Sequence, residues 1–164
     1  MSIADKFEEA LTIVANQGFK TSKYLGWKTR KARKDIAFNP EGVIFHHTAA
    51  WETIDWMLYR SGNGKVKAPL CHFSIDRNGK ITLGAAGYAN HAGSNNKAAV
   101  GEVLAGADKE VKPRADTPDY SANRRTIGVE VKCPGAYNEA QRKASVALAA
   151  ALVTVFGWDK IKIP

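Results

Sequence analysis

The sequence contains few of the residues that build disulfide or metal frameworks, with only two cysteines and four histidines among 164 residues. Two cysteines are too few for a disulfide framework. The fold must therefore depend on a hydrophobic core, and the chain is long enough to bury one. Hydrophobic residues make up 45% of the chain. This is ordinary for one globular domain and excludes collagen-like, coiled-coil and wholly disordered proteins.

Long apolar runs are also missing from the sequence. The longest lies near residues 144–156 and is far shorter than the roughly 18 residues that a membrane span requires. The N-terminus lacks the basic start and the apolar core of a signal peptide, and it carries Glu8 and Glu9 instead. We therefore expect no membrane span, no signal peptide and synthesis in a cytoplasm.

Acidic residues are outnumbered, since 16 Asp and Glu stand against 24 Lys and Arg and give a net charge of +8. Such an excess favours a polyanionic partner, for example nucleic acid or an anionic cell wall. Many of the basic residues lie in 20–34, which we interpret as a connector that packs on the domain through interleaved aromatic residues. No recognisable nucleic-acid motif accompanies them, so we predict no nucleic-acid partner.

Hydrophobic periodicity predicts an alternation of helices and strands. Helices are expected at 3–17, 52–60 and 138–156, and strands at 43–48, 70–76, 80–84 and 126–132. Residues 85–123 show no sustained period, and 161–164 look like the start of another strand. This order predicts an α/β fold with a mixed central sheet flanked by helices. We divide the chain into an N-terminal helix and basic connector at 1–40 and a main domain at 41–164.

Two positions on the predicted strands stand out chemically. His46 and His47 end a buried strand, and only one of them can face a given side because side chains alternate. A neutral imidazole there is a good zinc ligand, although a hydrogen-bonded core histidine is the commoner case. Glu130 lies between two valines, where a carboxylate is costly unless it is paired or used. The alternative is a salt bridge to Arg124 or Arg125.

Four segments follow one another in a specific order: VIFHHTA at 43–49, PLCHFSIDRNGKI at 69–81, ANHAG at 89–93 and NRRTIGVE at 123–130. Each resembles a motif of the zinc-dependent N-acetylmuramoyl-L-alanine amidases, a family that includes the peptidoglycan recognition proteins. GW at 26–27 and FNPEGV at 38–43 are similar to the amidase domains of actinobacteriophage endolysins. The resemblance covers about residues 24–164 and implies that 41–164 has the amidase-like fold.

The resemblance also implies roles for single residues. His46 matches the first zinc ligand of the family, and His47 matches the second histidine of the pair, which is not a ligand. Glu130 matches the acid that activates the zinc-bound water. The remaining residues expected to contact substrate in the groove are His91, Asn90, Thr48 and Cys71.

The implied function is that of an endolysin, a peptidoglycan hydrolase that cleaves the amide between N-acetylmuramic acid and the L-alanine of the stem peptide. Zn²⁺ is the expected cofactor and bacterial peptidoglycan the expected partner. We expect a monomer that is made in the host cytoplasm and acts on the bacterial cell wall.

One departure from the family pattern bears on activity. The family's other two zinc ligands follow the C-terminal helix, whereas here no histidine follows His91 and the sequence stops at Pro164. We therefore expect the C-terminal end of the fold to be absent, and zinc to bind weakly or not at all unless Cys71 or His91 substitutes. The alternative function is a non-catalytic peptidoglycan-binding module of the same fold.

Overall fold

A five-stranded mixed sheet organises the molecule in the computed structural model, which describes residues 1–51, 53–96 and 119–158. The strand order is β1-β4-β3-β7-β2. β7 runs parallel to both β2 and β3, β4 is antiparallel to β3, and β1 is parallel to β4. The strands are β1 Thr21–Lys23, β2 Gly42–His47, β3 Phe73–Ile75, β4 Ile81–Leu83 and β7 Thr126–Val131. The predicted α/β fold with a mixed sheet is confirmed.

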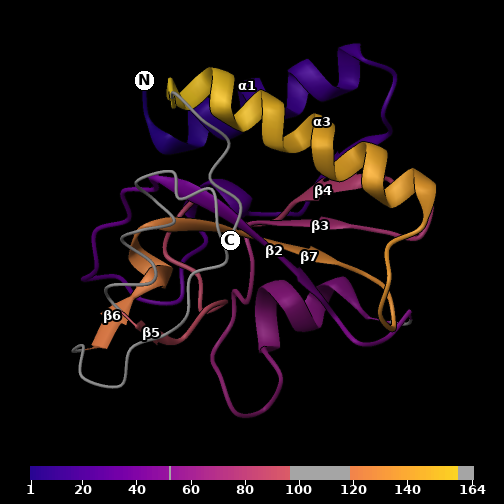
Figure 1. The fold of residues 1–164 in the computed structure, drawn as a ribbon. Helices are drawn as coiled ribbons and strands as arrows, with labels where there is room; N and C mark the ends of the chain where they lie inside the picture. The colour runs from indigo at the N-terminus through magenta and orange to yellow at the C-terminus, as the bar shows by residue number, and fades with distance from the viewer. Residues whose placement is uncertain (52, 97–118, 159–164) are drawn as a thin grey trace.

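Two long helices, α1 (Ile3–Asn16) and α3 (Glu139–Phe156), cover one face of this sheet (Figure 1). α1 buries one apolar stripe at helical spacing, as its sequence predicts. β7 contributes Ile127, Val129 and Val131 to the same core. Because side chains alternate along a strand, residues 128, 130 and 132 belong to the opposite face. The stripe of α1 consists of Phe7, Ala10, Leu11 and Val14.

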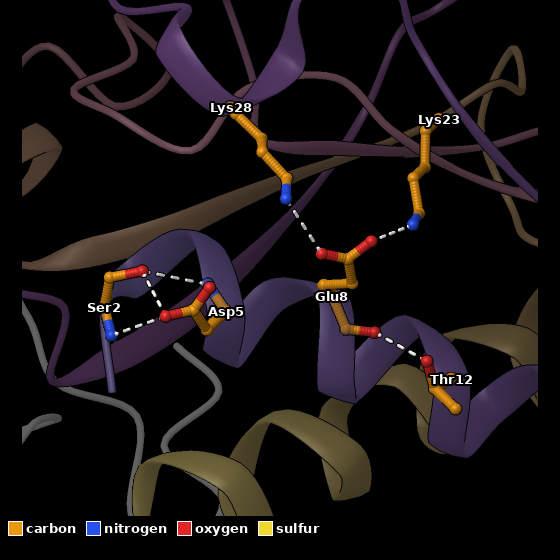
Figure 2. A network of polar contacts seen from close by, with 6 residues as sticks. All are labelled: Ser2, Asp5, Glu8, Thr12, Lys23 and Lys28. Atoms are coloured by element: carbon orange, nitrogen blue, oxygen red, sulfur yellow. Dashed lines mark hydrogen bonds and ion pairs between the residues drawn. The ribbon is translucent and has the colours of Figure 1, made fainter.

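Both helices begin with the capping box that their sequences encode. In α3, the Asn138 side chain accepts the Gln141 backbone N–H at 2.9 Å, and the Gln141 side chain accepts the Asn138 backbone N–H at 3.1 Å. Gly157 ends the helix with φ of 68°, a left-handed conformation that costs glycine little. Ser2 and Asp5 form the equivalent box on α1 (Figure 2).

The basic stretch at 20–34 is joined to α1 by ion pairs. Figure 2 shows Glu8 between Lys23 and Lys28, and its carboxylate pairs with both ammonium groups. Part of this stretch forms β1, which pairs with β4 at the edge of the sheet. The sequence did not predict this strand, because three polar residues at an edge carry no alternation and their hydrogen bonds come from β4.

Two other expectations differ from the structure, and a third cannot be compared with it. The short helix expected over 52–60 is a π-helical turn, η2, at Met57–Ser61. The Tyr59 ring of η2 packs directly on Gly84, where an added Cβ would lie 1.9 Å from the ring atom Cε1. Within 85–123, where no regular structure was expected, β5 (Ser94–Asn96) pairs antiparallel with β6 (Asp119–Ser121). These short polar strands show no periodicity, and their pairing joins segments distant in sequence. The strand expected at 161–164 lies outside the described residues.

η2 lies on the side of the sheet away from α1 and α3 (Figure 1). No helix in the described ranges is long and apolar enough to cross a membrane. The sheet therefore has one face sealed by two long helices and a second face on which polar side chains of β2 and β7 are placed.

Candidate active site

The candidate site is built on two neighbouring parallel strands. His46 on β2 and Glu130 on β7 are register partners, so their side chains leave the same face of the sheet side by side. Ser74 on β3 is the partner of Glu130 on its other side. The carboxylate thus lies between a hydroxyl and an imidazole, on the face that α1 and α3 leave uncovered.

A chain of hydrogen bonds holds the two histidines of the site. His46 Nε2 lies 3.1 Å from His91 Nδ1, and His91 Nε2 lies 3.0 Å from the carbonyl oxygen of Thr126. A carbonyl only accepts, so His91 Nε2 carries a hydrogen and, in the neutral ring, Nδ1 is the acceptor. His46 therefore donates through Nε2, which leaves Nδ1 as its lone-pair nitrogen. This tautomer assignment follows from the partner atoms.

The His91 ring is fixed by residues that the sequence analysis did not single out. The Asn123 side-chain oxygen accepts the backbone N–H groups of His91 and Ala92, at 2.9 and 2.7 Å. The ring lies directly against Gly128, where an added Cβ would be 2.4 Å from His91 Cγ. A glycine inside a strand often marks such a close approach, so Gly128 is the signal that points to this contact.

Burial sets the protonation of these groups. Desolvation raises the pKa of Glu130 from 4.5 to about 7. The pKa of His91 is lowered to about 3, mainly by desolvation and secondly by the neighbouring His46. The pKa of His46 is also lowered, mainly by burial. Near neutral pH both imidazoles are therefore uncharged, and Glu130 exchanges its proton close to neutrality.

Glu130 and His91 line a cavity of about 290 Å³. Asn90 and Asn123 contribute side chains to its wall, and Leu70 adds an apolar surface. One carboxylate oxygen of Glu130, Oε2, is buried without a hydrogen-bond partner. A carboxylate left in this condition is easily protonated and is available to hydrogen-bond a bound molecule or water.

The other predicted site residues are distributed unevenly around this cavity. Asn90 lines it and donates its side-chain N–H to the Lys67 carbonyl at 2.8 Å. Thr48 follows β2 and donates its hydroxyl to the Ala50 carbonyl, and His47 is exposed. Cys71 is fully buried against Leu58 and Tyr59. It is not among the residues that line the cavity.

The salt bridge considered for Glu130 is not formed. Arg125 pairs with Glu41 at 2.6 Å instead, and Glu130 has no ion pair with any residue in the described ranges. Arg125 precedes Thr126, at the opposite end of β7 from Glu130. The second cysteine, Cys133, packs in the main hydrophobic core as a small apolar side chain.

A catalytic zinc takes three protein ligands. Among residues 1–51, 53–96 and 119–158, no group of three His, Cys, Asp or Glu side chains is placed to hold a metal ion. His46 keeps one lone-pair nitrogen, whereas both ring nitrogens of His91 are engaged in hydrogen bonds. The described residues alone thus do not fit a complete zinc site.

A family model described as N-acetylmuramoyl-L-alanine amidase matches residues 37–163, which include both strands of the site and the loop that carries His91. The chain belongs to this amidase family. A search of curated proteins returned no significant match.

Solved structures with the same fold include two amidases from Clostridium intestinale and Drosophila PGRP-LB. The endolysin amidase LysCS of Clostridium intestinale matches with a TM-score of 0.59 at 16% identity, over 88% of this chain and 80% of its own. The amidase LysC from the same organism gives 0.60 at 16% identity, over 88% and 81%. Drosophila PGRP-LB gives 0.53 at 14% identity, over 88% and 80%. At these identities the likeness establishes the amidase fold.

Proposed function

We propose that this amidase-family chain hydrolyses the amide bond between N-acetylmuramic acid and the L-alanine of the peptidoglycan stem peptide. The observation that carries the proposal is Glu130, a carboxylate with a pKa of about 7 and an unpartnered buried oxygen on the wall of the cavity. A general acid–base group is most effective when its pKa lies near the working pH.

Glu130 serves both halves of the reaction in this proposal. As a carboxylate it takes a proton from the water that attacks the lactyl carbonyl of the muramic acid. As a carboxylic acid it returns that proton to the L-alanine nitrogen as the C–N bond breaks. His91 and Asn90 form the wall of the cavity that positions the substrate.

Zinc stays a prediction for this chain, with His46 as the ligand that the described residues supply. A zinc ion held there would supply Lewis-acid chemistry. Metal analysis of the purified chain, followed by a Zn²⁺ titration, measures whether stoichiometric zinc is held.

We further propose that the chain is a phage endolysin amidase that acts on the bacterial wall as a monomer. The molar mass of the protein in solution, measured by light scattering, tests whether it is a monomer.

The direct test is the chemistry of the product. Incubation with purified peptidoglycan is expected to release new α-amino groups whose N-terminal residue is alanine, without new reducing sugar ends. Glu130→Gln is expected to lower this rate by about 10²–10⁴-fold, the usual contribution of general acid–base catalysis. Glu9→Gln removes the same charge from an exposed position on α1 and is expected to leave the rate unchanged.

The same assay separates the two candidate functions. The alternative is a non-catalytic module of the same fold that binds peptidoglycan. Wall binding with no alanine amino groups released, in the presence of added zinc, would support that module and reject the hydrolase.

A further inference from the structure

A second cavity, of about 280 Å³, is lined by Lys132, which lies two residues further along the chain than Glu130 of the first cavity. Trp51 and Ile54 line it from the segment after β2, Arg77 from the turn after β3, and Lys132 from the residue after β7. It therefore sits beyond the carboxyl ends of three mutually parallel strands. Ligands of α/β sheets characteristically bind at that edge.

Among the described residues, Arg77 is the cation of this cavity that forms no ion pair. Lys132 is neutralised by an ion pair with Asp55. Asp76 is engaged by the turn, since its carboxylate accepts the backbone N–H groups of Asn78 and Lys80 at 2.8 and 2.9 Å. Within the described ranges of the chain, no carboxylate lies at ion-pair distance from the Arg77 guanidinium, whose carbon is 5.3 Å from the centroid of the Trp51 ring.

This arrangement is suited to a carboxylate ligand. A guanidinium presents paired N–H donors that match the two oxygens of a carboxylate. Contact with the Trp51 ring restricts the guanidinium before a ligand arrives, so less side-chain entropy is lost on binding. Trp51 and Ile54, at 39% and 50% exposed, add apolar surface for the aliphatic part of a ligand.

The spacing along β7 matches the proposed substrate. Glu130 lines the first cavity and Lys132, the next residue on the same face, lines the second. Such neighbours are about 6.6 Å apart. In a stem peptide, a carboxylate on the Cα of the second residue lies roughly 6 Å from the nitrogen of the scissile amide, because consecutive Cα atoms are about 3.8 Å apart. A substrate with its amide at Glu130 can therefore extend this carboxylate into the second cavity.

We propose that the cavity lined by Trp51, Ile54, Arg77 and Lys132 is the peptide subsite of the groove, and that Arg77 binds the α-carboxylate of the second stem-peptide residue. The proposal rests on the amidase function proposed for the Glu130 site. It assigns Arg77 a role in specificity, with no part in the chemical step.

The test compares two muramyl dipeptides that differ in one group. N-acetylmuramyl-L-alanyl-D-glutamate carries the free α-carboxylate, and its isoglutamine counterpart carries an amide there. Both are titrated into the Glu130→Gln protein, which prevents cleavage, and binding is followed by heteronuclear NMR. The acid is expected to bind about tenfold more tightly than the amide. The largest shifts are expected at the Trp51 indole N–H and the Arg77 Nε–H.

Arg77→Gln in the same background is expected to bind the acid as weakly as the amide. Arg60→Gln is the matched control, because Arg60 is exposed, loses the same charge and does not line the cavity. It is expected to keep the tenfold preference. Arg77 is also exposed, and retention of the backbone NMR spectrum checks that its variant is folded.

Two results overturn the subsite: equal affinity of the parent protein for acid and amide, or a preference that survives in Arg77→Gln. Either leaves the amidase proposal intact, because the muramyl peptides still bind. Binding of neither dipeptide contradicts the amidase proposal and the subsite together.

Discussion

Glu130 illustrates how one side chain can be costly for folding and useful for chemistry. Its position between Val129 and Val131 on a central strand removes its carboxylate from water, and no described residue compensates the charge. The same desolvation that raises its pKa to about 7 destabilises the folded state whenever the group is ionised.

The first residue-scale prediction concerns stability and pH. The folded pKa of Glu130, about 7, lies above the ordinary value of 4.5, so the folded state binds more protons between these values. The unfolding free energy should therefore fall as pH rises from about 4.5 to 7, by up to about 3 kcal/mol. Glu130→Gln removes this pH-dependent loss of unfolding free energy, because glutamine does not ionise. In EDTA, its stability advantage over the parent should be near zero at pH 4 and largest above pH 7, as measured by urea unfolding.

Glu9→Gln provides the reference for that measurement, because Glu9 is exposed on α1. Its unfolding curve should follow the parent at each pH. A Glu130→Gln advantage that does not change between pH 4 and pH 8 would mean that the carboxylate is solvated in the folded protein.

The second residue-scale prediction uses Gly128. A Cβ at this position would lie 2.4 Å from His91 Cγ, so Gly128→Ala must displace the ring and break its hydrogen bond to His46. We expect a loss of about 1–3 kcal/mol of stability, the usual cost of overpacking. Gly135→Ala is the control, since its Cβ meets no atom within 4 Å and should change stability by less than about 0.5 kcal/mol. Thermal unfolding measures both, and equal changes would contradict the close approach.

At the scale of elements, local sequence signals and tertiary pairing determined different parts of the fold. α3 was predictable because Asn138, Gln141 and Gly157 encode its two ends within a few residues. β2 and β7 were predictable because their apolar runs are continuous or alternating. β1, β5 and β6 were not, since three-residue polar strands exist only through backbone hydrogen bonds to partners elsewhere in the chain.

The prediction at this scale tests the capping of α3. Asn138→Ala removes the acceptor for the Gln141 N–H and the donor to the Arg77 carbonyl, so it should cost about 1 kcal/mol of stability. Val146→Ala lies on the exposed side of the same helix and should cost less than about 0.5 kcal/mol. Urea unfolding compares the two variants, and equal losses would show that the capping box does not contribute.

For the whole molecule, the net charge of +8 is distributed unevenly between paired and unpaired cations. Lys23 and Lys28 are paired with Glu8, whereas Lys31 and Lys34 are exposed in the basic stretch. Charge of this kind acts at long range and favours adhesion to an anionic bacterial wall over a contact with one defined ligand.

The prediction at this scale is therefore a salt dependence. Retention on purified walls should fall as NaCl is raised from about 0.1 to 1 M, because the screening length shrinks from about 10 to 3 Å. Replacing Lys31 and Lys34 with Gln should weaken retention at low salt more than the same change at Arg142 and Lys143, which both form ion pairs with Glu139. Equal losses in the two double variants would argue against a role for the basic stretch, and retention independent of salt would argue against electrostatic adhesion.

The sequence by itself determined the fold class and the amidase family, and it indicated the two residues on which the candidate site is built. His46 and Glu130 could be singled out as candidates because each is a polar residue on an otherwise apolar strand, and the order of the four motifs gave them roles through the resemblance to the amidase family. The tertiary structure decided what surrounds them: the hydrogen bond from His46 to His91, the anchoring of the His91 loop by Asn123, and the separate cavity at Arg77. These contacts join segments far apart in the chain, and their geometry depends on strand register and on burial, which no local pattern encodes.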